Sequence, residues 1–273
     1  MCKDPALGYL NDFGYNVVRL PRADIRPLDL IGRHRGSVER IGRLDQLLTP
    51  SKNPIPTIRW NCPVSGLEGQ LSNQLDFSFA AKIVASFVQG LGGNPAVSSK
   101  LSQLSKLQIQ LTDVKSDRTE PAAIGQLLDG ATLETSNPLW APFLRGDGKL
   151  FVIFETLKSS RLKLHVDEAH SASASVDLPI LREVAGANVA VEVKKESGMS
   201  LAFSGTQQLV FGFKCLELSL SDGFIELRLA PPSVRAAMGV RSPDALRGEV
   251  PQQSSDQDGA ALLCEDDLID LPV

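Results

Sequence analysis

The spacing of hydrophobic positions changes along the chain. Between residues 79 and 91 apolar side chains recur every three or four positions, which predicts an amphipathic helix lying on a sheet. From about residue 104 the spacing becomes two. Leu107, Ile109 and Leu111 alternate there with polar side chains, the pattern of a half-buried strand. The chain therefore mixes helix and strand early and is dominated by strand later.

The remaining pattern predicts an α+β fold with a central twisted, largely antiparallel sheet and peripheral helices. A short helix is expected over Pro5 to Phe13 and another over residues 121–129. After Pro231 and Pro232 the chain becomes polar and irregular, as in a linker. The predicted strands are NVVRL, SVERIGRLDQLL, LFVIFETL, RLKLHVDEAHSASASVDL, NVAVEVKK, MSLAFSG, QQLVFGFKCLEL and GFIELRLA.

The stretch 162–178 is two-faced and unusually long for a strand. Leu162 and Leu164 fall on one face, and Lys163 and His165 on the other. At about 3.3 Å per residue it would span roughly 50 Å. We expect residues 188–196 to be its partner. Such strands are typical of a half-buried sheet on a soluble core, but they also meet the requirement for a transmembrane barrel. The pattern leaves both interpretations open.

Composition favours an ordinary globular protein. The chain has 273 residues, of which 42% are hydrophobic and 22% charged, consistent with one domain and a tail. Its four cysteines lie far apart without a CxxC spacing, which argues against a zinc site or a disulfide framework and fits a reducing compartment. No apolar run reaches the roughly 18 residues of a membrane helix. We expect the protein to be soluble as made.

Charge is unevenly distributed. The whole chain carries a formal net charge of -4, from 28 basic and 32 acidic residues. Residues 248–273 hold seven acidic residues and no Lys or Arg, so the rest has 28 basic against 25 acidic residues, or +3. An acidic end is typically a solvated tail. Here, however, apolar residues are mixed into it at helical spacing, which favours a short helix docked on the body.

Catalytic and metal-binding patterns are scarce. The chain has three histidines, and His165 and His170 would point to opposite faces of a strand, so they cannot share a metal ion. There is no GxSxG, no HExxH and no phosphate loop. Neither a catalytic residue nor a metal ligand is predicted, and we expect a protein that is not an enzyme.

The remaining candidate for chemistry is Cys2, directly after Met1. No signal peptide can precede it, so we do not expect an exported lipoprotein. It could be an N-terminal nucleophile, an acylation site or an inert thiol. The charged and proline-containing KDPALGYL that follows is unlike the buried strand that begins at an N-terminal nucleophile. The residues alone leave the three roles open.

The opening MCKDPALGYLNDFGYNVVRLPRADIRPLDLIG resembles the start of bacterial gasdermins. Chain length, two-faced strands and a short acidic tail after a polar linker agree with this resemblance. It implies a pore-forming domain over residues 1–238, a cleavable linker over 239–259 and a C-terminal inhibitory segment over 260–273. The inhibitory contacts would come from Leu262, Leu263, Leu268, Ile269 and Leu271.

The resemblance also implies a mode of action. Cys2 would carry a covalent palmitoyl group, with no other cofactor. A caspase-like or other protease, encoded nearby, would cut the linker, and we expect the cut at Leu246 or Arg247, just before the acidic block. The cytoplasmic protein would then oligomerise with itself and form large β-barrel pores in the inner membrane lipids. The result would be cell death in antiphage defence, without a nucleic-acid partner.

Two alternatives remain open at this point. One is an N-terminal-nucleophile amidohydrolase that uses Cys2, and the other is an acylated binding module that does not lyse membranes. The mass of the intact protein would separate a free nucleophile from an acylated thiol. Leakage from liposomes after proteolysis would separate a binding module from a pore.

Overall fold

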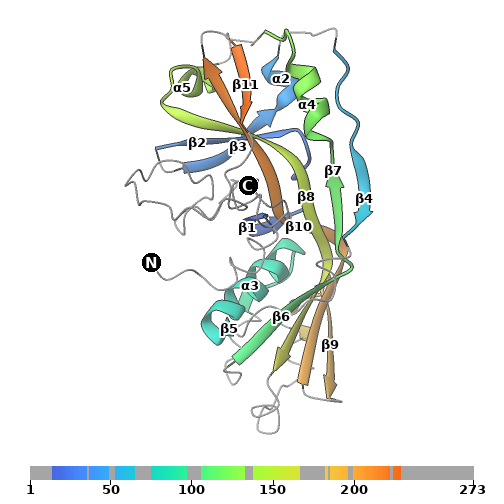
Figure 1. Cartoon of the computed structure of the whole chain (residues 1–273). Helices are drawn as coiled ribbons and strands as arrows, with labels where there is room; N and C mark the ends of the chain where they lie inside the picture. The colour runs from blue at the N-terminus through green and yellow to red at the C-terminus, as the bar shows by residue number, and fades with distance from the viewer. Residues whose placement is uncertain are drawn as a thin grey trace, which may run out of the picture.

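Two long antiparallel strands form the axis of the molecule. They are β8 (Gly148–Val166) and β10 (Met199–Ser221), of 19 and 23 residues. They pair along almost their whole length, from Met199 opposite Val166 to Leu218 opposite Leu150, and run from end to end of the molecule in Figure 1. The computed structural model describes residues 14–35, 37–48, 53–64, 75–96, 106–132, 138–166, 182–183, 185–195, 199–221 and 224–228.

The other strands attach to the two free edges of this pair and complete an 11-stranded sheet. Along the edge of β8 lie first β2, then β7 and then β6. Along the edge of β10 lie β11, β1 and β9. The outer strands β3, β4 and β5 pair with β2, β7 and β6. Their bounds are β1 Asn16–Arg22, β2 Asp29–His34, β3 Ser37–Arg43, β4 Arg59–Pro63, β5 Leu75–Asp76, β6 Lys106–Thr112, β7 Lys115–Arg118, β9 Ala190–Lys195 and β11 Phe224–Arg228.

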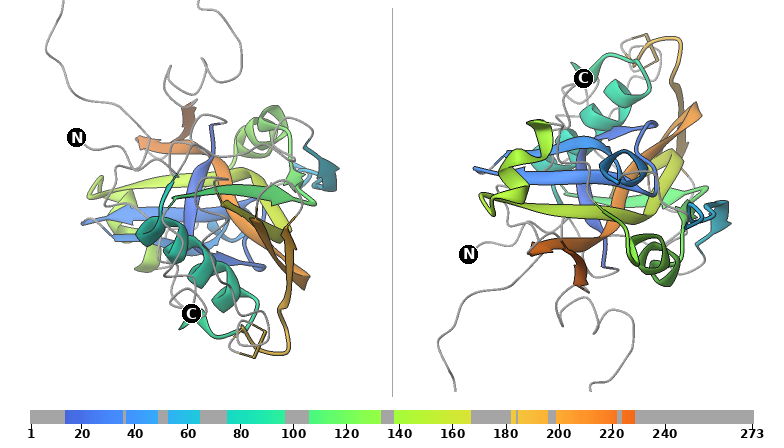
Figure 2. Two further views of the ribbon diagram at one scale, coloured as in Figure 1. Left: turned by 90° about the horizontal axis from the view of Figure 1, so that it is seen from below. Right: turned by 90° about the horizontal axis from the view of Figure 1, so that it is seen from above.

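Helices cover this sheet at separate places. The longest, α3 (Phe77–Gly90), lies over the end of the sheet that holds β6 and β9, and α4 (Pro121–Leu128) lies at the other end. Both views of Figure 2 show α3 and α4 on opposite sides of the strands. The remaining short elements are α2 (Leu44–Leu47), η2 (Pro138–Trp140) and α5 (Ala141–Leu144). The predicted α+β class, with a largely antiparallel sheet and peripheral helices, is confirmed.

Separate apolar clusters form where helices meet the sheet. One lies between α3 and the lower strands and includes Phe87, Leu164 and Phe203, all fully buried. A second lies under α2, α4 and α5 and includes Trp140. Between the ends, the buried residues of β7 and β8 are partly polar. Asp117 there forms an ion pair with Lys158, with 2.7 Å between carboxylate and Nζ. The apolar core is therefore divided into separate clusters, and the residues packed against α3 form one of them.

Several predicted strand boundaries are wrong. The stretch SVERIGRLDQLL is a strand only to Arg43, and α2 follows because Leu44 and Leu47, three residues apart, both turn into the core. LFVIFETL and the start of RLKLHV are one strand, β8. MSLAFSG and QQLVFGFKCLEL are likewise one strand, β10. The polar residues between those pairs separate the predicted strands, but they lie at irregular positions, or β-bulges, within continuous strands.

Other predictions are confirmed in part or lie outside the described residues. The helices predicted over 79–91 and 121–129 are α3 and α4. The strand β2, which the sequence pattern does not predict, follows Pro27. The opening helix over Pro5 to Phe13, the second half of the stretch 162–178 and all residues after Arg228 lie outside the described part of the chain.

Candidate functional site

Four strands at the α3 end form one part of the 11-stranded sheet, which we call the distal sheet. It comprises β6, residues 161–166 of β8, residues 199–204 of β10, and β9, in the order β6–β8–β10–β9. The predicted pairing of 162–178 with 188–196 is wrong for the described residues. Residues 162–166 already have β6 on one edge and β10 on the other, so β9 pairs with β10 instead.

One face of the distal sheet is apolar and buried. Alternate residues of each strand point to this face, as the period of two requires. Against it α3 packs Val84, Phe87 and Val88, and Leu91 follows the helix into the same cluster. The helix thus shares one apolar cluster with residues of all four strands. The side chains on the sheet side of this cluster are Ile109, Leu111, Leu162, Leu164, Val191, Met199, Leu201 and Phe203, with Val193 partly buried at the rim.

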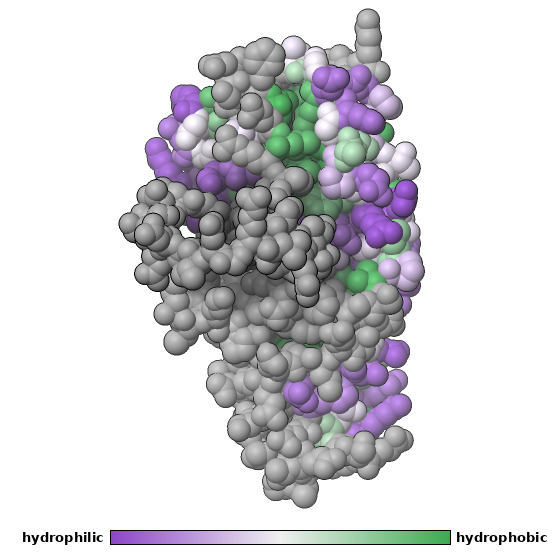
Figure 3. All heavy atoms as spheres, viewed as in Figure 1, coloured by the Kyte–Doolittle hydropathy of each residue, from purple (hydrophilic) through white to green (hydrophobic). Residues whose placement is uncertain are grey.

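The opposite face is polar and partly or fully exposed. It presents Gln110, Lys163, His165, Glu192 and Lys194. His165 and Gln110 are linked across β8 and β6, with 3.1 Å between Nε2 and Oε1. In Figure 3 the described atoms at the lower end of the molecule are mostly hydrophilic, in agreement with this assignment. The described strands are therefore two-faced, as the sequence pattern predicts.

A band of irregular backbone separates the distal sheet from the rest, and we call it the junction. In β10, residues 205–208 lie between Ser204, opposite Arg161, and Leu209, opposite Ser159, so four residues face one residue of β8. On the other edge of β8, β6 passes into β7 through Asp113, which has a positive φ of 56°. Bulges bend and twist a strand. The extra residues of β10 and the β6–β7 connection lie on the two opposite edges of β8, at the same level along that strand.

Polar contacts hold the junction together. The hydroxyl of the buried Ser159 donates to the Thr112 carbonyl oxygen at 2.6 Å and accepts from the Arg161 amide at 3.0 Å. Ser160 donates to the Asp113 carboxylate at 2.7 Å, and Lys115 lies 3.1 Å from the same group. The hydrogen bond from Ser160 lowers the pKa of Asp113, and the ammonium group of Lys115 lowers it further. The sequence pattern does not predict this network, because its hydrogen bonds join residues that lie 47 positions apart in the chain.

The end of α3 fits closely against its neighbours. A Cβ added at Gly90 would lie 2.5 Å from the Pro21 carbonyl oxygen of β1, so only glycine allows this approach. Tyr15, just before β1, belongs to the same apolar cluster, and its hydroxyl donates to Glu155 at 2.9 Å. Burial, followed by the charge of Glu155, raises the pKa of Tyr15. Tyr15, near the start of the described residues, thus lies in the cluster under α3.

The site residues predicted from sequence lie outside the described residues. This applies to Cys2, to Leu246 and Arg247, and to the apolar residues of the inhibitory segment. Their roles stay predictions. Within the described residues, no group of His, Cys, Asp or Glu could hold a metal ion. No helix in the same part of the chain is both long and apolar enough to cross a membrane.

The fold and the site together define a class of protein. It is an α+β protein built on one curled antiparallel sheet. Its distinctive feature is a set of strands with one apolar and one polar face, of which the apolar face packs against a helix. Comparison with known proteins gives the family. A sequence model described as the Bacterial Gasdermin Family matches residues 18–224, and the chain belongs to this family.

Individual relatives agree with this assignment. The chain is 35% identical to gasdermin bGSDM of Vitiosangium sp. (strain GDMCC 1.1324), over 99% of this chain and 98% of the relative. It is 29% identical to gasdermin bGSDM of Lysobacter enzymogenes, over 92% and 93% of the two chains. A solved bacterial gasdermin from Bradyrhizobium tropiciagri has a similar fold, with a TM-score of 0.60 at 20% identity, covering 82% of this chain and 90% of that one. Gasdermins are pore-forming effectors rather than enzymes, which confirms the prediction of a non-enzymatic protein.

The packing of α3 gives a first testable prediction. Phe87→Ala removes a fully buried ring from the cluster that joins α3 to the distal sheet. We expect the free energy of unfolding to fall by about 3 to 5 kcal/mol, the usual cost of truncating a buried phenylalanine. Denaturant unfolding measures this change. The control is Gln89→Ala on the exposed side of the same helix, where the change should stay within about 0.5 kcal/mol. Equal effects of the two substitutions would contradict the assigned packing.

Proposed function

We propose that this chain is an autoinhibited pore-forming protein whose distal sheet is rebuilt as membrane-spanning strands after proteolysis. The observation that carries the proposal is the distal sheet itself: four adjacent strands with one apolar face, against which α3 packs in the described part of the chain. Strands that alternate apolar and polar side chains meet the requirement of a transmembrane barrel, where lipid contacts one face and the lumen the other. Family membership supports the same function.

The length of the strands determines what must change on activation. A transmembrane strand needs about 9 to 11 residues. In the distal sheet, β6 has seven residues and β9 six, so both are too short as they stand. We therefore infer that the strands lengthen. Extra residues would come from the stretch 162–178, from 188–196 and from the region 60–118. In lipid, acyl chains would replace α3 as the cover of the apolar face.

The C-terminal segment is the proposed inhibitor. Ala261, Cys264, Leu268 and Leu271 recur at helical spacing, so residues 260–271 can form a short helix with an apolar stripe. A helix shorter than about 12 to 15 residues is marginal alone and must dock to be stable. Burial of each Leu or Ile side chain contributes about 1.5 to 3 kcal/mol. Ordering the segment costs roughly 1.5 kcal/mol per residue, so the net gain is small.

Proteolysis would act by removing the tether. While the linker over 239–259 is intact, the inhibitory segment stays near its docking surface at an effective concentration in the millimolar range. Cleavage at Leu246 or Arg247 lowers that concentration to the bulk value. The segment then leaves with the acidic residues that follow the cut. After a cut behind Arg247 the remaining body carries a net charge of +3, from 28 basic and 25 acidic residues, and after a cut behind Leu246 it carries +2, because Arg247 leaves as well. A positive body is better suited to anionic lipid head groups.

A palmitoyl group on Cys2 would supply a membrane anchor. Each buried methylene contributes on the order of 0.8 kcal/mol, so exposure of the acyl chain to water is unfavourable. In the intact protein the chain would lie in an apolar part of the body. Tyr15 supports a location near α3, because it brings the N-terminal segment to the apolar cluster there. A single acyl chain gives only marginal membrane binding, so the apolar strands and the basic body would have to add to it.

The biological role that follows is cell death in antiphage defence. A caspase-like or other protease, encoded nearby, would activate the cytoplasmic protein, which would then oligomerise with itself in the inner membrane. No nucleic acid takes part in this proposal. An amidohydrolase acting through Cys2 and a non-lytic acylated module are the competing functions, and measurements of dye release and of intact mass distinguish them.

The inhibitory role of the tail is tested with dye-loaded anionic liposomes. A foreign protease site is inserted after Arg247, and dye release is followed before and after cleavage. We expect intact protein to be silent and cleaved protein to release dye. Leu268→Asp should release dye without cleavage, because it places a charge on the docked stripe. Silence after verified cleavage, or silence of Leu268→Asp, would show that the tail is not the inhibitor.

The membrane-facing side of β9 is tested by two matched substitutions. Val193 lies on the apolar face and Ala190 on the exposed face of the same strand. Val193→Asp should block dye release, since a charge on the lipid face of a barrel strand is destabilising in every copy. The cost is about 2 to 4 kcal/mol for Lys or Arg at the bilayer midplane and less for Asp. Ala190→Asp adds the same charge towards the lumen and should be tolerated. Equal release by the two cleaved variants would remove β9 from the membrane-spanning part.

Acylation is tested by the mass of the intact protein purified from its own host. We expect an added mass close to that of a palmitoyl group in the unchanged protein and its loss in Cys2→Ala. Killing of cells after activation should also become slower in Cys2→Ala. If the added mass is absent from the unchanged protein and killing is equally fast in both, Cys2 is not a lipid attachment point. Amide hydrolysis that depends on Cys2 would favour the amidohydrolase.

A further inference from the structure

The outer edge of β9 presents backbone groups that no other strand of the described chain pairs with. Among the described residues, β10 is the strand that β9 pairs with, through one of its two edges. The carbonyl oxygen of Val191 accepts a hydrogen bond from Arg182, which lies outside the sheet. This bond shows that the carbonyl group points away from β10. In a strand, the N–H and C=O of one residue point to the same side, and every second residue shares that direction. The backbone groups of Val191 and Val193 therefore face outward, as a template for another strand.

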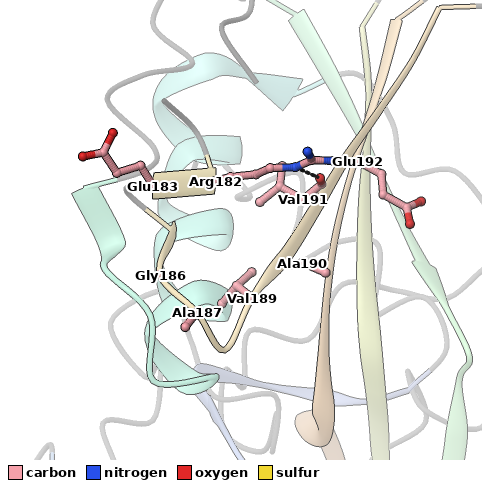
Figure 4. Close-up of a pocket in the computed structure, with 8 residues that line it drawn as sticks. All are labelled: Arg182, Glu183, Gly186, Ala187, Val189, Ala190, Val191 and Glu192. Carbon is pink, nitrogen blue, oxygen red and sulfur yellow. Dashed lines mark hydrogen bonds between the residues drawn. The ribbon is translucent and has the colours of Figure 1, made fainter. Parts of the chain in front are cut away.

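Arg182 occupies this edge. Its Nε donates to the Val191 carbonyl oxygen at 3.0 Å, and Figure 4 shows the guanidinium reaching across to β9 while Glu183 points away. Beside the edge is a pocket of about 500 Å³ lined by residues 182–183, 186–187 and 189–192. The outer edge of β9 is thus next to a pocket, and the Arg182 side chain is hydrogen-bonded to this edge. A cationic side chain on an edge is a common way in which proteins discourage strand addition.

The segment that carries Arg182 is also held by the end of α3. The Asn94 amide, just after α3, donates to the Ala185 carbonyl oxygen at 3.3 Å, and Ala185 is fully buried. A Cβ added at Gly93 would lie 2.3 Å from the same oxygen, so the two backbones are in direct contact. Movement of α3 away from the distal sheet would therefore disturb the position of Arg182.

We propose that Arg182 is an edge guard, which closes β9 against strand addition by a second copy of this chain until α3 is displaced. This inference rests on the proposed pore-forming function and adds a brake on assembly to it. The partner is a second copy because a sheet in lipid must satisfy all its backbone groups, so an open edge of β9 has to be paired. A strand supplied by a neighbouring copy satisfies Val191 and Val193 and continues the sheet.

The test compares rates of assembly after cleavage. The full chain with a protease site after Arg247 is cut in the presence of anionic dye-loaded liposomes, and cross-linking in uncharged detergent micelles reports oligomers independently of leakage. Arg182→Ala should shorten the lag before release and before cross-linking by about fivefold, the factor expected for about 1 kcal/mol from one exposed hydrogen bond. Loss of a positive charge would slow binding to anionic lipid, so electrostatics cannot produce this acceleration.

Two further variants make the outcome decisive. Arg145→Ala removes the same charge at an exposed site at the other end of the sheet, and its lag should not shorten. Val193→Pro removes an outward N–H while leaving the β10 ladder intact, so the monomer should fold but neither oligomerise nor release dye. The guard is disproved if Arg182→Ala matches Arg145→Ala, or if Val193→Pro assembles like the unchanged chain. If the unchanged cleaved chain neither cross-links nor leaks, the proposed function itself fails, and the guard with it.

Discussion

The pairing of β8 with β10 is the interaction on which the rest of the structure depends. Their ladder runs from Met199 opposite Val166 to Leu218 opposite Leu150, and most of the other strands of the sheet attach directly to one of its two edges. One end of this pair lies under the α2, α4 and α5 cluster, and the other under α3. Because β8 and β10 extend through both ends of the sheet, the distal sheet and the rest of the molecule are joined by these two continuous strands. The proposed change of cover would therefore leave the strands of the distal sheet anchored in the body.

The junction explains how one pair of strands can support two environments. The extra residues 205–208 of β10 lie where Ser159 and Asp113 close a compact polar network. Above it, the sheet is held by two packed clusters and a buried ion pair between Asp117 and Lys158. Below it, among the described residues, α3 is the helix that packs against the apolar face. In the proposed function this packing is what lipid replaces, because a bilayer offers those same side chains an apolar environment.

The alternation of apolar and polar residues in the sequence predicts much of this arrangement. What it cannot predict has physical reasons. The period of two in Leu162 and Leu164 predicts correctly which side chains are buried, because a strand has only two faces. Pattern could not predict that β10 rather than β9 lies beside them, because pairing is decided by the whole sheet. Bulges at 158–161 and 205–208 resemble turns in sequence, since both favour polar residues. No sequence pattern pointed to Arg182, because its proposed role depends on a hydrogen bond to a backbone carbonyl group nine residues away in the chain.

The central claim is that the apolar face of the distal sheet passes from α3 to lipid when the tail is removed. An environment-sensitive fluorescent amino acid at position 193, compared with one at position 190, measures this directly on liposomes that contain lipid-linked nitroxide quenchers. After cleavage, the account predicts strong quenching by nitroxide in the acyl region at position 193. At position 190 it predicts quenching by a water-soluble quencher instead. Dye release without nitroxide quenching at position 193, or equal quenching at the two positions, would contradict it.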